Sequence, residues 1–393
     1  MTSPQNRRIW IGLGAVVALL ISIPAVPGCS WRYRLWAIRT KSADPLFQFE
    51  KDGKAGYMDA KGRVVIQPNL HDVGGFGGEF HEGLLRVKDE VGYRYIDKSG
   101  ATAFRLDAWL AFEFSEGLAA AALESGPSRR VLWGFIDRTG RFVIEPKYFT
   151  VSGFSEGLAR VGVEGQFGST GYIDQFGNFA IPPTLSDGSS FHEGLAIAIM
   201  DGPCLITNGG SCSPPKFRPA RRDADYDCRF RIIDKTGRPV SELRFDGARD
   251  FSEGLAAVRL GELWGYADKS GHIAIEPQFE YSGEFSQGRA AVSVNGKWGF
   301  IDRSGAFVIP PRFESAAAFS DGRAVVYEKA ADQEGYYRFI DMSGAPAFPA
   351  TYAFAESFTF GLAAVELPST GNSGRQAAWI DTAGRIVYQF RLK

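Results

Sequence analysis

From residue 44 onward, the apolar positions fall into short runs of four to six residues separated by turn residues. One stretch shows the pattern: Leu255–Val258 and Trp264–Ala267 are apolar on both faces, the segment 268–271 reads Asp-Lys-Ser-Gly, and His272–Ile275 follows. Pro277 ends the third run because proline cannot donate to a continuing ladder. The pattern predicts a three-stranded antiparallel meander.

This unit recurs nine times along the chain. The aspartates that close its second strand are separated by 34 to 40 residues, except for one step of 60, and they are Asp59, Asp97, Asp137, Asp174, Asp234, Asp268, Asp302, Asp341 and Asp381. A second phrase of the type F-S-E-G-L-A-A-V alternates with the first, and its phenylalanines are Phe80, Phe114, Phe154, Phe191, Phe251, Phe285, Phe319 and Phe358.

The two phrases resemble the WG (or KWG) repeat of bacterial proteins over about residues 45–390. The best copies, such as W-G-F-I-D-R-T-G-R-F-V-I-E-P, begin at three tryptophans that we predict to be core aromatics: Trp133, Trp264 and Trp298. The resemblance implies an envelope or surface protein with an interaction role. It offers no catalytic residue to transfer.

Asp at the first and Gly at the fourth position of each D-x-x-G segment suit a type I turn whose glycine is left-handed. We therefore predict structural roles for these turn residues, best seen in Asp137, Gly140, Asp268, Gly271, Asp302 and Gly305.

Strands that are apolar on both faces require the units to stack on one another. We predict an all-β domain of about nine stacked three-stranded meanders that form an open superhelix or solenoid. A propeller-like ring is the alternative, although blades usually have four strands and rings are often sealed by mixing strands from both termini.

Composition narrows the function. The 393 residues carry a net charge of -1, which argues against a nucleic-acid binder, and they contain 47 Gly but only 4 His and 4 Cys. So few histidines and cysteines leave little material for metal or nucleophile chemistry. We expect no enzyme activity and no cofactor.

Residues 1–43 form a predicted targeting segment with six basic and no acidic residues. The uncharged stretch Ile9–Trp31 fits a signal sequence or an uncleaved membrane span. Val26–Cys29 resembles a bacterial lipobox, in which Cys29 would be lipidated. A cleaved soluble form and a buried cytosolic helix are weaker alternatives. We therefore expect a body, residues 44–393, held at the extracytoplasmic side of a bacterial membrane.

The 60-residue step contains an insertion in the fifth unit, residues 200–229, rich in Pro, Gly, Arg and Asp. It holds Cys204, Cys212 and Cys228. In an oxidising compartment these favour one disulfide, Cys204–Cys212 or Cys204–Cys228, over a zinc site, which usually needs four ligands. We expect this exposed loop to carry specificity.

Repeated polar residues have simpler structural explanations. His81 and His192 stand where other units have serine or threonine, which predicts exposed positions and no catalytic base. Rows of Asp and Glu from stacked units could bind calcium, but we favour Asp capping its own turn and Glu remaining solvated or bonded locally.

These observations predict a non-catalytic, envelope-anchored scaffold that binds a protein or a cell-envelope glycan. The alternative is a propeller-type enzyme acting on carbohydrate, which would need carboxylates from different units to converge in one central pocket.

Overall fold

The computed structural model describes residues 44–71, 73, 78–125, 130–163, 169–200, 205–206, 212–213, 229–329, 335–368 and 375–391. The chain divides into two compact units, Met1–Ala37 and Ile38–Lys393, and every described residue belongs to the second. The predicted anchor Ile9–Trp31 and Cys29 therefore lie outside the described residues. Within the described ranges, no helix is long and apolar enough to cross a membrane.

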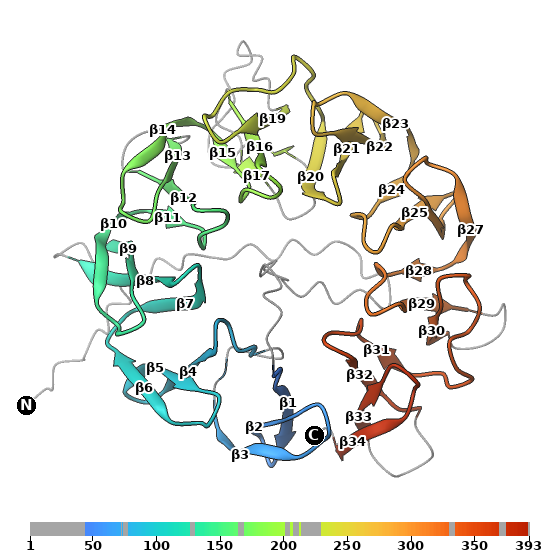
Figure 1. Cartoon of the computed structure of the whole chain (residues 1–393), viewed down its shortest axis with the longest axis horizontal. Coiled ribbons are helices and arrows are strands. Elements are labelled where there is room, and N and C mark those ends of the chain that lie inside the picture. Colours follow the sequence, from blue (N-terminus) through green and yellow to red (C-terminus); the bar gives the residue numbers. More distant parts are fainter. Residues whose placement is uncertain are drawn as a thin grey trace, which may run out of the picture. The chain divides into compact units, whose positions relative to one another are not determined.

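The described elements are antiparallel strands in nine consecutive sheets, here called blades 1 to 9, plus one small hairpin (Figure 1). The first three blades consist of β1 (Phe47–Lys51), β2 (Lys54–Met58) and β3 (Val64–Leu70); β4 (Leu84–Asp89), β5 (Gly92–Asp97) and β6 (Thr102–Leu106); and β7 (Leu110–Ser115), β8 (Leu118–Ser125), β9 (Arg130–Ile136) and β10 (Phe142–Tyr148). The next three consist of β11 (Thr150–Val151), β12 (Ala159–Gly162), β13 (Thr170–Ile173) and β14 (Phe179–Leu185); β15 (Asp187–Gly188), β16 (Leu195–Ile199) and β19 (Phe230–Asp234); and β20 (Gly247–Ser252), β21 (Leu255–Leu260), β22 (Leu263–Asp268) and β23 (Ile273–Phe279). The last three consist of β24 (Tyr281–Ser282), β25 (Ala290–Val294), β26 (Lys297–Ile301) and β27 (Phe307–Phe313); β28 (Ser315–Ala316), β29 (Ala324–Glu328) and β30 (Tyr336–Ile340); and β31 (Phe354–Ala355), β32 (Leu362–Glu366), β33 (Gln376–Asp381) and β34 (Ile386–Arg391). The small hairpin pairs β17 (Leu205–Ile206) with β18 (Cys212–Ser213).

The nine blades of this unit form a closed propeller, so the expected open superhelix is wrong and the alternative ring is right. Blade 1 lies against blade 9, where β1 is next to β34 (Figure 1). The rings of Phe47 and Trp379 are 5.2 Å apart, and those of Phe49 and Tyr388 are 4.9 Å apart. The indole nitrogen of Trp379 donates to the carbonyl oxygen of Gln48 at 2.8 Å.

Closure needs no exchange of strands between the termini, because blades 1 and 9 are each built from consecutive strands. The two-residue inner strands and seven-residue outer strands of blades 4 and 7 give these blades a wedge shape, which curves the stack. An open stack would leave the outward faces of the terminal blades in water. In the ring, Phe47, Met58 and Leu362 are instead buried in one cluster, and burial of apolar surface favours this arrangement.

Most blades also contain a strand that the hydrophobic pattern did not predict. In blades 3 to 9, an additional strand precedes the F-S-E-G-L-A-A-V strand and pairs with it on its inner side. In blades 5 and 8 the predicted third strand is reduced to isolated bridges, so these two sheets still have three strands. Most of these inner strands are only two residues long, too short to show a hydrophobic period.

The glycine of the Trp-Gly pair permits a bulged outer strand. A Cβ atom on Gly134 would lie 2.3 Å from the carbonyl oxygen of Ile144 and 2.7 Å from the nitrogen of Pro146, and glycines in four other blades are similarly crowded: Gly56, Gly171, Gly265 and Gly299. The ladders of these five outer strands each shift register twice. Where Arg94 or Ala378 replaces the glycine, the outer strand shifts only once.

Candidate functional site

Each blade presents two different ends. In an antiparallel meander, successive turns alternate between the two ends. The Glu-Gly turn after the inner strand and the D-x-x-G turn before the outer strand therefore share one end, the turn face. The hairpin that follows the F-S-E-G-L-A-A-V strand, or β1 in blade 1, lies at the opposite end, the loop face, together with the connection to the next blade.

On the turn face, each D-x-x-G aspartate caps its own turn. The Oδ1 atom of Asp137 accepts from the amides of Thr139 (2.8 Å) and Arg141 (3.2 Å), and Gly140 is left-handed with φ 84°. The Thr139 hydroxyl also donates to this carboxylate and lowers the pKa of Asp137. The same geometry occurs at Asp268–Gly271 and Asp302–Gly305. Among the described residues, no group of three His, Cys, Asp or Glu side chains is placed to hold a metal ion.

We expected the recurring glutamates to stay solvated or to bond locally, and this expectation is wrong. They form latches between blades. Glu116, with φ 54°, accepts from the amide of Gly157 in the next blade at 2.8 Å. Equivalent latches of 2.8 to 3.0 Å run from one blade to the next at Glu82–Gly117, Glu156–Gly194, Glu193–Gly254, Glu253–Gly288, Gln287–Gly322 and Asp321–Gly361.

Neighbouring groups reinforce these latches. Although partial burial raises the pKa of Glu156, the Gly194 amide and Lys235 outweigh it and hold that pKa below its usual range. Hydroxyls from five blades donate to the next blade's Phe carbonyl at 2.6 to 2.7 Å; they belong to Ser115, Ser155, Ser252, Ser286 and Ser320. His81 and His192 occupy this serine position, and both are half-buried rather than exposed. Most of these turn-face side chains therefore form bonds between blades that hold the ring together.

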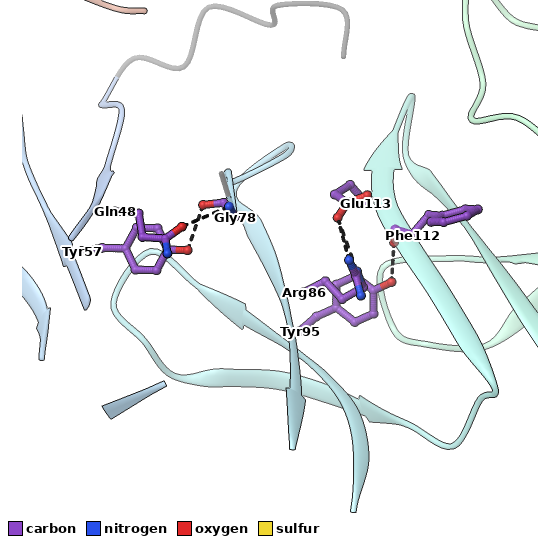
Figure 2. Close-up of polar contacts among 7 residues, drawn as sticks. All are labelled: Gln48, Tyr57, Gly78, Arg86, Tyr95, Phe112 and Glu113. Atoms are coloured by element: carbon purple, nitrogen blue, oxygen red, sulfur yellow. Dashed lines mark hydrogen bonds and ion pairs between the residues drawn. The ribbon is translucent and has the colours of Figure 1, made fainter. Parts of the chain in front are cut away.

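Tyrosines add a third bond between blades (Figure 2). Tyr57 donates to the carbonyl of Gly78 at 2.8 Å, and Tyr95 donates to that of Phe112 at 2.5 Å. Burial raises the pKa of both hydroxyls far above the usual value, so they remain protonated donors. Tyr172 and Tyr266 make the same bond in blades 4 and 6.

The three predicted core tryptophans differ in burial. Trp264 is only 5% exposed and lies under the guanidinium groups of Arg249 and Arg259. Trp133 and Trp298 are half-buried and stack on an inner-strand ring of their own blade, Phe112 at 4.7 Å and Tyr281 at 6.2 Å respectively.

The loop face is irregular where the turn face is uniform. Blades 1, 2, 6 and 7 close this end with two-residue links, such as Gly261–Glu262 in blade 6. The corresponding segments are longer in blades 3, 4, 5, 8 and 9, where they span 126–129, 163–169, 200–229, 329–335 and 367–375. The insertion thus lies between β16 and β19, and its hairpin β17–β18 is next to β15. Cys204 and Cys228 lie outside the described residues, and of Cys212 only the backbone, in β18, is described.

Several blades expose aromatic side chains on the loop face, and blades 3 and 4 are neighbours that both do so. In blades 7 and 9, Tyr281 (56% exposed) and Phe354 (36% exposed) hold the position that Leu110 has in blade 3. Trp109 is 53% exposed, and Leu110 and Phe149 are each 38% exposed. Trp109 and Phe149 are equivalent, because their amides make the same bond to the second strand of blades 3 and 4, at 2.9 and 2.8 Å. Trp109, Leu110 and Phe149 are called the aromatic patch below.

Blades 6 and 7 carry acids at the position of Trp109 and Phe149. Asp246 accepts from the amide of Gly261 at 2.7 Å, and Glu280 accepts from that of Gly296 at 2.8 Å. These carboxylates close tight hairpins within their own blades, whereas the aromatic patch is next to the longer links of blades 3 and 4. Sequence inspection missed the patch because single aromatic residues at unaligned positions carry no periodic signal.

An ion pair joins the inner strand of blade 6 to blade 5. Asp250 in blade 6 lies 3.6 Å from Nε2 of His192 in blade 5, and it also raises the pKa of Glu284 in blade 7.

A family model described as "WG containing repeat" matches this sequence six times, at residues 56–90, 133–167, 171–202, 230–264, 264–298 and 298–329. No curated protein matches the sequence. Among solved structures, a eukaryotic initiation factor is 12% identical with a TM-score of 0.60, over 89% of this chain and 96% of that one. Hsv2p of Kluyveromyces lactis is 11% identical with a TM-score of 0.35, over 67% and 96%. At such identities, the similarity to the initiation factor concerns the fold alone. The TM-score of the match to Hsv2p is too low to support any conclusion.

Proposed function

The chain belongs to the family of WG-containing repeat proteins, and on this basis we propose that it is a non-catalytic scaffold of the bacterial cell envelope whose loop face binds a protein or an envelope glycan. The observation that carries the proposal is the contrast between the two faces. Turn-face carboxylates and hydroxyls bond to the ring itself, while the loop face combines links of variable length with the exposed aromatic patch. Exposed apolar clusters rimmed by polar residues are typical of interaction sites.

The aromatic patch suits either class of partner. Trp and Tyr dominate the binding energy of many protein interfaces, and aromatic faces also pack on sugar rings. The insertion at 200–229 joins β16 to β19 at this face, and its sequence contains Arg218, Arg221 and Arg222, which would favour an anionic partner. Specificity would then come from the insertion, and affinity from the aromatic patch.

The experiment is affinity capture from envelope extracts with the full chain, in parallel with sedimentation on purified cell-wall glycan. The test variant combines Trp109→Ala with Phe149→Ala, and the control is Phe176→Ala, which removes an 85% exposed aromatic from the turn face. We expect the double variant to lose a partner or glycan that the wild type and the control both retain. Equal capture by all three would contradict the proposed surface.

Anchoring is tested separately with Cys29→Ser. A lipoprotein would accumulate as a longer, unprocessed precursor, whereas a single-span protein would change neither its mass nor its membrane attachment. Export of an unchanged soluble protein would contradict both forms of anchoring.

A further inference from the structure

The tryptophan of the Trp-Gly pair is covered differently from one blade to another. In blade 3, the ring of Phe112 is stacked on that of Trp133, with ring centres 4.7 Å apart and an angle of 12° between the planes. In blade 6, the guanidinium groups of Arg249 and Arg259 lie 5.2 and 5.9 Å from the centre of the Trp264 ring. In both blades, side chains of the chain itself therefore cover the indole.

Blade 7 has the same tryptophan, Trp298, without these covering side chains. In blades 3 and 6 the first cover is the residue two positions before the buried phenylalanine of the unit, and in blade 7 that residue is Gly283. The second cover of blade 6, Arg259, is the cross-strand partner of the tryptophan, and Ser293 takes its place in blade 7. A glycine and a serine are too short to reach over an indole.

The indole of blade 7 is accordingly accessible on the loop face. Trp298 is half-buried, and the ring stacked on it belongs to Tyr281, which is 6.2 Å away and mostly exposed. A Cβ atom on Gly283 would have its three nearest neighbours in Ala291 of the same blade, at 3.3 to 3.8 Å. No atom of another blade therefore crowds the start of the path that Arg249 follows in blade 6.

The polar groups beside this indole favour a cation. Glu280 accepts from the Gly296 amide at 2.8 Å and from the Ser293 hydroxyl at 3.0 Å, and these bonds hold the pKa of Glu280 below its usual range. Its equivalent in blade 6 is Asp246, whose carbonyl oxygen accepts from Nη2 of Arg259 at 2.7 Å. Blade 7 thus has the tryptophan and the acid of blade 6 but lacks both arginines.

Two further comparisons favour a cation over a ring. In blade 3, where an aromatic ring covers the tryptophan, the position of Glu280 belongs to the uncharged Trp109. Lys297, which directly precedes Trp298, has its Nζ atom 2.6 Å from Oε1 of Glu314 in blade 8, so its charge is already balanced.

We propose that Trp298, Tyr281 and Glu280 form a site on the loop face that binds an arginine side chain of a protein partner, with the guanidinium over the indole as Arg249 lies over its tryptophan in blade 6. Arginine suits the site because its planar, weakly hydrated guanidinium stacks on aromatic faces and keeps its charge. The inference rests on the proposed loop-face function and names a protein as the partner at this point. The site is separate from the aromatic patch, which belongs to blades 3 and 4.

The experiment follows the indole N–H signals of the full chain by NMR, with isotope-labelled tryptophan, during titration with a Gly/Ser hexapeptide that contains one central arginine. The Trp298 signal is identified by its loss in Trp298→Phe. We expect a saturable shift of this signal and none of the Trp264 and Trp133 signals, because those two rings are already covered. A peptide with citrulline in place of arginine keeps the shape but not the charge, and it should bind about 5- to 30-fold more weakly.

Two variants change the site itself. Gly283→Arg supplies from the chain the guanidinium that blade 7 lacks, and it should abolish the shift. Glu280→Gln removes the charge without removing the side chain, and it should weaken binding of the arginine peptide but not of the citrulline peptide. The matched control is the double variant Trp109→Ala and Phe149→Ala, which should bind the arginine peptide as the wild type does.

Three results would overturn the proposal. They are equal binding of the two peptides, undiminished binding by Gly283→Arg together with Glu280→Gln, and a Trp298 shift caused by a tetramer of N-acetylglucosamine but not by the arginine peptide, which would assign the site to a glycan. Because neither variant alters the aromatic patch, each of these results leaves the capture experiment with Trp109 and Phe149 to decide the proposed loop-face function separately.

Discussion

The turn face and the loop face are built by the same nine units, yet they differ in how freely they vary. On the turn face, every unit from the second to the eighth places a Glu, Gln or Asp side chain on the next unit's glycine amide. On the loop face, the equivalent hairpins range from two-residue links to the insertion at 200–229. The motif residues therefore hold the ring together, and the opposite end varies in length without disturbing these bonds.

Replacing one tryptophan on each face should give the largest difference in the free energy of unfolding. Trp264→Ala should lower the free energy of unfolding by about 3–5 kcal/mol, because its ring is almost fully buried. Trp109→Ala on the loop face should cost less than about 1 kcal/mol, because half of its surface is already in water. Chemical denaturation measures both. Similar losses in the two variants would contradict the division of roles.

Two left-handed glycines, one on each face, should differ in how much stability is lost when they are replaced by alanine. Gly305 on the turn face has φ 86°, and a Cβ there would lie 2.9 Å from Cγ2 of Ile275 in the preceding blade. Gly261 on the loop face has φ 63°, and a Cβ there would meet no atom within 4 Å. Backbone strain alone costs about 1 kcal/mol, so Gly261→Ala should lose about that much and Gly305→Ala about 2–4 kcal/mol. Urea titration of both variants gives the two values, and a smaller loss at Gly305 would be inconsistent with tight packing between blades.

A smaller effect is expected from a single latch. Glu253→Ala leaves the amide of Gly288 without its side-chain partner, which should cost about 1–2 kcal/mol. Glu253→Gln is the matched control, since Gln287 makes the same bond in the next blade at 2.9 Å. The glutamine variant should unfold within about 0.5 kcal/mol of wild type. If it were as unstable as the alanine variant, charge rather than the amide bond would be the source of the stability.

The turns and the three-stranded meanders were largely predictable because the residues that form them are close together in the sequence. The recurrence of Asp and Gly at a fixed spacing predicts the D-x-x-G turns, and short runs apolar on both faces predict stacked meanders. The inner strands were missed because most of them are only two residues long, and the latches because their partners are one unit away in the sequence. Glu116, for example, reads as a turn residue until Gly157 of the next blade is placed beside it.

The pattern of the repeats left a closed ring as the alternative to an open superhelix, although the sequence does mark the junction of the first and last blades. In the last unit, Phe360 replaces the latch glutamate and Trp379 stands where most other units have Tyr or Phe. Both pack at the junction with blade 1, where Trp379 reaches the Gln48 carbonyl because no inner strand covers β1 in the described residues. A unit that exchanges its polar latch residue for an aromatic one and enlarges a second aromatic is therefore a signal of closure that an alignment of the repeats can reveal.

The most direct test of the account places a photo-crosslinking amino acid at Trp109, Phe149 or Phe176 in the full chain within intact cells. All three positions are exposed and aromatic, but the first two lie on the loop face and the third on the turn face. We predict specific adducts with a partner from positions 109 and 149 and none from position 176. Adducts from position 176 alone would contradict the central claim that the turn face holds the ring and the loop face binds.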